Sequence, residues 1–340
     1  MEIPTGFLPM FAPKLTPHTP AAQWKVTALG GGHGLSASLQ ALRRLDTDLT
    51  AVVTVADDGG SSGTLRDEFG VLPPGDLRMA LAALCDDTEW GRTWADVMQH
   101  RFASRPDSAR TLDRHALGNL LIVALWEMLQ DPVEGLRWAG SLLGARGRVL
   151  PVSTTPLTIH GTVLSQDNDG ALSSRAVAGQ VELARAAQRG RVTEVGLDPA
   201  TAPGTPEAIE AINEADWNVL GPGSWFTSVL PHLLLPDVRN ALEQSPARTL
   251  VTMNLTTDTS ETLELDAADH LDLIRRYAPR LRVDAVLADP TSVEDVARFR
   301  EAAHRLGARV FFDRVGQRDG QPVHDPLRLA AAYRDVISSF

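Results

Sequence analysis

The chain alternates between short, continuous apolar segments and segments with helical periodicity, and this alternation is its strongest constraint on fold. The apolar segments lie at 25–30, 49–56, 216–221, 248–254, 283–288 and 308–312. Strands without apolar–polar alternation suit a parallel sheet that is covered on both faces. Helical patterns lie between them, most clearly at 35–45, 77–85, 117–129, 133–143, 206–214, 229–244, 267–277 and 292–306. The sequence therefore predicts a doubly wound, Rossmann-like α/β fold with a mostly parallel sheet and helices on both faces.

One segment departs from this alternation. Residues 157–180 contain two extended stretches around the turn Asp167-Asn168-Asp169-Gly170, followed by an Ala-rich helix. This pattern predicts a small antiparallel hairpin inserted into the domain. Residues 1–22 are rich in proline, which predicts a poorly ordered tail. We expect residues 23–340 to form a single domain.

Composition and charge exclude several classes of protein. The net charge of −11 over 340 residues argues against a general nucleic-acid binder, which needs basic patches. The single cysteine, Cys85, excludes an internal disulfide framework, and its helical context is typical of a small core residue. There is no apolar run of transmembrane length and no signal-peptide pattern, so we expect a cytoplasmic protein without a membrane span.

A glycine-rich turn follows the first predicted strand. Gly30–Gly34 leads directly into a helix at Leu35. Glycines let a ligand approach the backbone closely, and the free N–H groups at a helix N-terminus favour phosphate. The segment predicts a phosphate-binding turn, although a tight strand-to-helix turn without a ligand has the same composition.

The second predicted strand ends in two acids. Asp57 and Asp58 are followed by the small residues Gly59, Gly60, Ser61 and Ser62. Such a loop is able to wrap a sugar or phosphate, and the two carboxylates are candidate Mg²⁺ ligands. A solvated turn is the alternative.

A proline-rich entry then leads to Asp76 and Arg78. We predict Asp76 as the N-cap of a helix that begins at Leu77. Arg78 in the first turn is unfavourable for the helix dipole, so we expect it to contact a ligand phosphate, Asp57 or Asp58. A weak surface pair with Asp76 or Glu68 is the alternative.

Two further segments carry polar residues in apolar surroundings. His115 and Asn119 are four residues apart, which predicts one helical face and a pair of ligand contacts, or else a cap and a satisfied amide. The turn Gly221-Pro222-Gly223 follows another predicted strand. Ser224 is placed to cap the next helix and to leave amides near Thr227 free for an anion.

The segments GGGHGL, TVADDGGSSGTLR, LPPGDLR, HALGNLL, GPGSWFTSVLPHLL and MNLT occur in the order seen in the CofD-like superfamily. Taken together they resemble its YvcK branch, the gluconeogenesis factors, rather than the branch of 2-phospho-L-lactate transferases. The match runs from about Val26 to His270. The resemblance implies a cytoplasmic regulatory protein that binds UDP-activated sugars such as UDP-N-acetylglucosamine. It also implies a role in cell shape and wall synthesis on gluconeogenic carbon, with no established reaction.

The resemblance carries a set of candidate nucleotide contacts onto this sequence. They are Gly30, Gly31, Gly32, His33, Gly34, Leu35, Asp57, Asp58, Gly59, Gly60, Ser61, Ser62, Asp76, Arg78, His115, Asn119, Gly221, Gly223, Ser224, Thr227 and Asn254. Two positions depart from the family pattern: His33 stands where threonine is common, and residues 257–262 differ from the expected Gln-Pro-Gly-Glu-Thr.

Three functions are compatible with these residues. The first is a nucleotide-sugar-binding regulatory protein with a protein partner in cell-wall synthesis, expected to form a homo-oligomer. The second is a transferase of the phospholactyl type that uses a guanosine diphosphate donor and Mg²⁺, with Asp57, Asp58, Asp76 and Arg78 as candidate catalytic residues. A nicotinamide-dependent dehydrogenase ranks lowest, because no convincing hydride site is visible.

Overall fold

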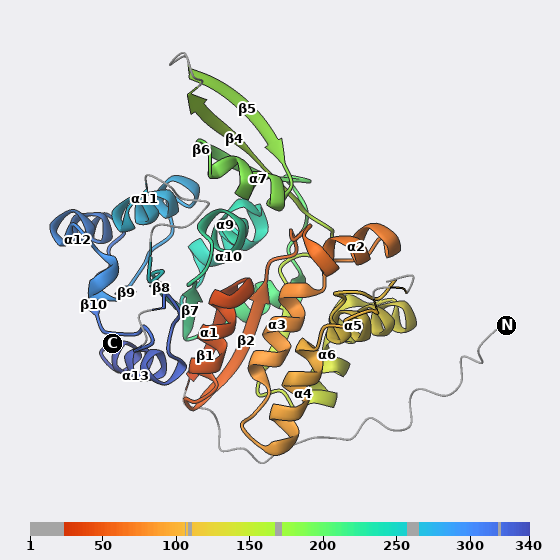
Figure 1. The fold of residues 1–340 in the computed structure, drawn as a ribbon. Helices are drawn as coiled ribbons and strands as arrows, with labels where there is room; N and C mark the ends of the chain where they lie inside the picture. The colour runs from red at the N-terminus through yellow and green to blue at the C-terminus, as the bar shows by residue number, and fades with distance from the viewer. Residues whose placement is uncertain (1–23, 106, 108–110, 167–171, 257–264, 319–320) are drawn as a thin grey trace.

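A seven-stranded sheet forms the centre of the computed structural model, which describes residues 24–105, 107, 111–166, 172–256, 265–318 and 321–340. The strand order is β10-β9-β8-β7-β1-β2-β3, and each pair of neighbouring strands is parallel (Figure 1). The strands are β1 (Trp24–Gly30), β2 (Thr47–Val53), β3 (Arg148–Pro151), β7 (Trp217–Leu220), β8 (Arg248–Thr252), β9 (Ala285–Ala288) and β10 (Arg309–Phe312). The predicted parallel α/β fold is therefore confirmed.

The order of the strands creates a switch point between β1 and β7. From β1 the chain continues to β2 on one side, whereas from β7 it continues to β8 on the other. The two strands pair directly, with Val26 opposite Trp217 and Leu29 opposite Leu220. In open α/β sheets, ligands bind beyond the carboxyl ends of the strands at such a point.

Helices cover both faces of the sheet. The helices are α1 (Gly32–Leu42), α2 (Gly60–Phe69), α3 (Gly75–Leu84), α4 (Glu89–Gln99), α5 (Leu117–Leu129), α6 (Pro132–Leu143), α7 (Gln180–Ala187), α8 (Pro206–Glu214), α9 (Leu230–Leu234), α10 (Pro236–Gln244), α11 (Ala267–Tyr277), α12 (Val296–Arg305) and α13 (Pro326–Ile337). On one face α1 packs between α3 and α13, and α8 to α12 form the other layer. No helix in the described ranges is long and apolar enough to cross a membrane.

The structure corrects some of the predicted boundaries. The predicted helix 229–244 is instead three segments: a π-helical turn at Trp225–Val229, then α9 and α10. Pro231 and Pro236 explain the breaks, because proline lacks an N–H and restricts the residue before it. Strand β3, helices α2, α4 and α13, and the strand at 191–198 were not predicted.

A second, smaller sheet confirms the predicted hairpin. Strand β4 (Thr158–Gln166) pairs antiparallel with β5 (Leu172–Ala178), and the turn predicted at Asp167–Gly170 lies outside the described residues. A third strand, β6 (Arg191–Asp198), pairs antiparallel with the other side of β4. Figure 1 shows these strands projecting beyond the main sheet, with α7 beside them.

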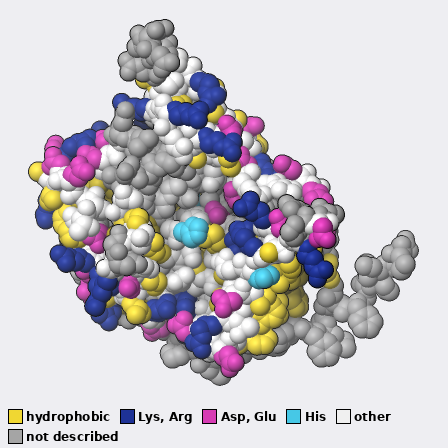
Figure 2. All heavy atoms as spheres, in the orientation of Figure 1, with side chains coloured by type: hydrophobic (Ala, Val, Ile, Leu, Met, Phe, Trp, Pro, Cys, Tyr) yellow, Lys and Arg dark blue, Asp and Glu magenta, His cyan; other side chains and the backbone are white. Residues whose placement is uncertain are grey.

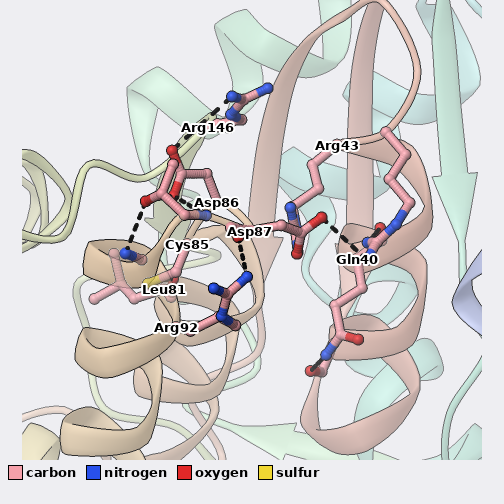
Figure 3. A network of polar contacts seen from close by, with 12 residues as sticks. Gln40, Arg43, Leu81, Cys85, Asp86, Asp87, Arg92 and Arg146 are labelled. Carbon is pink, nitrogen blue, oxygen red and sulfur yellow. Dashed lines mark hydrogen bonds and ion pairs between the residues drawn. The ribbon is translucent and has the colours of Figure 1, made fainter.

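Ion pairs link residues that follow α1 and α3, at the helix ends that lie away from the switch point. Arg43, just after α1, bonds the carboxylate of Asp87 at 2.6 Å, and Arg146 lies 3.9 Å from Asp86 (Figure 3). Cys85 ends α3 there, is buried, and donates its thiol to the Leu81 carbonyl at 3.5 Å. The prediction of Cys85 as a small core residue is therefore confirmed.

A buried hydrogen-bond network at the switch point joins α1, α13, β8 and the turn after β7. The Tyr333 hydroxyl, on α13, lies 2.6 Å from the Ser38 hydroxyl on α1 and 3.0 Å from the Thr252 hydroxyl on β8. Ser38 also donates to the Gly221 carbonyl at 3.0 Å. Burial raises the pKa of Tyr333 to about 12, so its hydroxyl stays protonated and available to this network. The last helix thus helps to fix the turn after β7.

The turns after β1 and β7 approach each other closely at Gly34. A Cβ atom added there would lie 2.2 Å from the Pro222 carbonyl oxygen and 2.6 Å from the Cα of Gly223. Only glycine fits between these two segments of backbone. The residue type at this position therefore sets how closely the two turns can approach.

We expect Gly34→Ala to lower the melting temperature, at a cost of about 2 kcal/mol or more, because the added methyl group forces the two turns apart. The matched control is Gly140→Ala in α6, where the nearest atom to an added Cβ is 3.7 Å away. That change should leave the melting temperature unchanged or raise it. Equal melting temperatures for Gly34→Ala and the wild type would contradict the close approach.

Candidate functional site

A cavity of about 390 Å³ lies at the switch point. The turns after β1 and β7 form its floor, and the segment after β8 and a late loop form its sides. Its lining residues are Gly31, Gly32, His33, Gly34, Ala37, Asp76, Gln180, Pro222, Gly223, Ser224, Thr227, Ser228, Asn254, Leu255, Thr256, Pro322, Val323 and His324. The structure therefore brings together nine of the predicted site residues here: Gly31, Gly32, His33, Gly34, Asp76, Gly223, Ser224, Thr227 and Asn254.

The N-terminus of α1 faces this cavity, and there the Gly32 amide bonds the Asp76 carboxylate. Gly31 is the N-cap residue and has no side chain to accept the first amides. Gly32 adopts φ +57°, a conformation that favours glycine. A Cβ at Gly31 would lie 2.5 Å from an Asp76 carboxylate oxygen, so Asp76 is close to the helix end. The glycines thus keep the backbone accessible where the helix dipole favours an anion.

The turn after β7 is held by Asn254. Its side-chain carbonyl accepts from the Gly223 amide at 2.8 Å, and its amide donates to the Gly223 carbonyl at 2.9 Å. Ser224 caps the following turn, as predicted, but it accepts from the Thr227 amide at 3.2 Å. The expectation of a free amide at Thr227 is therefore wrong, because the cap itself uses that amide. Asn254 positions the turn through both of its polar atoms.

A second cavity, also of about 390 Å³, lies beside the first and shares Asp76 with it. Its lining residues are Asp57, Gly59, Gly60, Ser61, Ser62, Gly75, Asp76, Arg78, Met79, Arg101, Arg114 and Asn119. The predicted small-residue loop is in fact the start of α2, with Gly59 as N-cap and Asp57 accepting from the Gly59 amide at 3.0 Å. The glycines and serines therefore form a helix N-terminus against this cavity.

Two acids in this region have raised pKa values, in both cases mainly because they are buried. Burial raises the pKa of Asp76 to about 7, and the charge of Asp57 adds to the shift. The pKa of Asp57 is also raised, mainly by burial, despite hydrogen bonds from Gly59 and Ser62. A proton or a cation beside the pair would relieve both effects. The prediction of Asp76 as the N-cap of α3 is wrong, because the helix begins at Gly75, two residues before the predicted Leu77, and Pro74 is its N-cap.

Arg78 is buried beside these acids but pairs with neither of them. Its guanidinium bonds the Gln99 side chain and lies 3.5 Å from the Met98 carbonyl. Burial lowers its pKa to about 10, with the charge of Arg101 adding to the shift. Neither the expected contact with Asp57 or Asp58 nor the alternative surface pair is present among the described residues.

His115 and Asn119 meet at Ser61, though not as one helical face. Helix α5 begins at Leu117, so His115 precedes its N-cap. The Ser61 hydroxyl lies 3.0 Å from the His115 ring nitrogen Nδ1 and accepts from the Asn119 amide at 3.0 Å. The prediction that His115 and Asn119 share one helical face is therefore wrong, and the contact of both with Ser61 was not predicted.

Five predicted contacts line neither cavity: His115, described above, and the four that follow. Asp58 accepts from the Val181 amide at 3.0 Å and so completes the N-terminus of α7. Leu35 is 1% exposed and belongs to the core. Gly30 ends β1, and Gly221 adopts φ +75° and contacts the Thr252 carbonyl. These four residues contribute to the structure of the turns and of the core rather than to a cavity wall.

Some lining residues were missed by sequence reasoning. Arg101 and Arg114 line the second cavity and lie on either side of residues 106 and 108–110, which are outside the described residues. Arg114 adopts φ +65°. His324 and Gln180 reach the first cavity from segments far along the chain. The one available signal was Arg114, which directly precedes the predicted contact His115.

The switch-point cavity, with glycine turns on adjacent parallel strands, places the chain in the doubly wound class whose ligands bind at the carboxyl edge of the sheet. The family model described as "2-phospho-L-lactate transferase CofD" matches residues 26–324. The chain belongs to the CofD family.

Within this family the similar proteins are gluconeogenesis factors. "Putative gluconeogenesis factor" of Mycobacterium tuberculosis is 45% identical over 316 residues, which cover 92% of this chain and 90% of that one. "Gluconeogenesis factor" of Bacillus subtilis is 36% identical over 271 residues, 80% of each chain. A crystal structure of a UPF0052-family protein from Bacillus halodurans superposes with a TM-score of 0.77 at 33% identity, covering 91% of this chain and 98% of that one.

We expect Asp76→Asn to stabilise the ligand-free protein at pH 8. The folded pKa of Asp76, about 7, lies above its ordinary value of 3.8, so the stability of the wild type falls as the pH rises from about 4 to about 7 and is lowest above that. The gain from the substitution should be at most about 4 kcal/mol at pH 8 and should fall below about 1 kcal/mol at pH 4, where Asp76 is protonated in the folded state and partly protonated in the unfolded state.

Thermal unfolding between pH 4 and 8 measures this difference. The control is Asp335→Asn on the exposed face of α13, which should shift the melting temperature little at any pH. A stabilisation by Asp76→Asn that is constant over this pH range would contradict a raised pKa of Asp76 in the folded protein.

Proposed function

We propose that this protein is a cytoplasmic regulatory protein that binds a nucleotide sugar of the UDP-N-acetylglucosamine kind in the switch-point cavity. The observation that carries the proposal is the N-terminus of α1, whose N-cap residue is a glycine and which meets the glycine turn after β7 at this cavity. A diphosphate placed there accepts backbone amides and lies at the positive end of the helix dipole. Leu255, Pro322 and Val323 supply apolar cover for the remainder of the ligand.

In this proposal a Mg²⁺ ion accompanies the diphosphate and is held by Asp57 and Asp76. Mg²⁺ needs only one or two carboxylates, because it keeps several waters. The raised pKa of both acids fits a pair that a cation compensates. Asp58 fits less well than the sequence suggested, because its carboxylate bonds the N-terminus of α7. The ion would neutralise the negative charges of Asp76 and of the phosphates where they meet. The protein residues would bind and orient the ligand.

The cellular role that we propose follows the similar proteins named gluconeogenesis factors. The bound nucleotide sugar would report the supply of wall precursors, and a protein partner in wall synthesis would read the occupied state. A transferase of the phospholactyl type is the second candidate function. The observation that favours it is the second cavity, which adjoins the first at Asp76 as an acceptor site would adjoin a donor site.

Melting scans with UDP-N-acetylglucosamine and with GDP, each with and without Mg²⁺, test the proposal. At about 100 times its dissociation constant a ligand that binds only the folded state adds about 2.7 kcal/mol of stability. We expect UDP-N-acetylglucosamine with Mg²⁺ to stabilise most. Stabilisation by GDP alone would favour the transferase instead, and no stabilisation by either would refute nucleotide binding.

Asn254→Ala should weaken this effect, because it releases the Gly223 turn from both of its side-chain hydrogen bonds. A tenfold loss of affinity would reduce the ligand-induced stabilisation from about 2.7 to about 1.4 kcal/mol at the same ligand concentration. The matched control is the exposed Asn213→Ala in α8, beyond the opposite edge of the sheet. An equal response of the two variants to the ligand would contradict the site.

A further inference from the structure

We propose that the second cavity is a separate binding site for a phosphate monoester that also carries hydroxyl groups, which is the chemistry of a sugar phosphate. Its wall combines two kinds of group. Three arginines supply positive charge, and carboxylate, hydroxyl and amide groups supply hydrogen-bond acceptors and donors. Figure 2 shows Lys and Arg side chains gathered near the middle of the displayed face, where Figure 1 places α2, α3 and α5.

Arg78 supplies the strongest indication that an anion binds. Its side chain is 3% exposed, yet no carboxylate in the described ranges forms an ion pair with it. Its contacts are the Met98 carbonyl and the Gln99 side chain, and its Nε atom has no hydrogen-bond partner. The charges of Asp76 and Asp57 act on this guanidinium from nearby, but neither carboxylate forms a salt bridge with it. An anion in the adjoining cavity would supply the direct partner that this buried charge lacks.

Arg101 and Arg114 extend this positive charge toward solvent. Both are exposed, and Arg101 donates to the Arg114 carbonyl at 2.9 Å, which holds the two segments together. Within the described part of the chain neither guanidinium has a carboxylate partner. Guanidinium groups bind phosphate oxygens in a bidentate manner, and three of them match a phosphate dianion better than a single carboxylate.

The remaining polar groups of the cavity wall are able to bind hydroxyl groups of a ligand. The side-chain carbonyl of Asn119, which is 1% exposed, has no hydrogen-bond partner, although its amide donates to Ser61. Asp57 adds a carboxylate acceptor, and Ser62 adds a hydroxyl. These acceptors repel a second anionic group but bind hydroxyl donors. The volume of about 390 Å³ is within the usual range for small-molecule sites, about 300–1,000 Å³.

This site shares Asp57 and Asp76 with the proposed Mg²⁺ position, but its arginines are separate from the proposed nucleotide site. The two cavities share Asp76, but the three arginines line only the second, and the glycine turns at Gly31–Gly34 line only the first. A failure of one proposal therefore leaves the other open to its own test.

Isothermal titration of the nucleotide-free protein with glucose 6-phosphate, inorganic phosphate and glucose tests the inference. We expect glucose 6-phosphate to bind at least tenfold more tightly than inorganic phosphate, and glucose to give no measurable binding. Arg101→Gln and Arg114→Gln should each weaken binding of glucose 6-phosphate about tenfold or more, because each removes charge-assisted hydrogen bonds. Both side chains are exposed, so both variants should fold.

The matched control is Arg334→Gln, an exposed arginine on α13 that lies outside both cavities. It should leave the affinity for glucose 6-phosphate unchanged, and Arg101→Gln should leave stabilisation by UDP-N-acetylglucosamine unchanged. The inference is overturned by an absence of glucose 6-phosphate binding to the wild type. It is equally overturned if Arg101→Gln and Arg114→Gln bind as tightly as Arg334→Gln, or if glucose binds as tightly as its phosphate ester.

Discussion

The close approach of the turns after β1 and β7 is the constraint on which the rest of the site depends. With no side chain at Gly34, the Pro222 carbonyl oxygen lies only 2.2 Å from the place where any other residue would have its Cβ. Behind this contact, Ser38 and Tyr333 tie the Gly221 carbonyl to α1 and α13. The two halves of the doubly wound sheet are therefore joined at their carboxyl edge by backbone packing and buried hydrogen bonds, and the first cavity lies above that junction.

Much of the fold was predictable from the sequence, because its signals are local. Continuous apolar segments located six strands of the parallel sheet, and the glycine turns were located by composition. Short strands were missed where the local signal is weak, as for β3, which has four residues and begins with Arg148. The π-helical turn before α9 was missed because apolar periodicity cannot separate three adjacent helical segments.

The candidate site was less predictable, because side-chain partners are set by tertiary packing. Asp57 and Asp58 are adjacent and appear equivalent in the sequence, but one lines a cavity and the other bonds the N-terminus of α7. The position of α7 depends on the small sheet, which begins about a hundred residues after this acid pair. Arg101 joins Arg78 for the same reason: α4, which ends just before Arg101, packs against α3, which carries Arg78.

Asp76 borders both cavities, and this shared position has a thermodynamic consequence. An occupant of either cavity changes the electrostatic potential at one carboxylate, whose protonation and charge then alter the other cavity. Linkage requires the effect to be mutual: whatever factor the first occupant imposes on the affinity of the second, the second imposes on the first. A single buried acid can thus make two neighbouring ligands cooperative or antagonistic without any movement of the backbone.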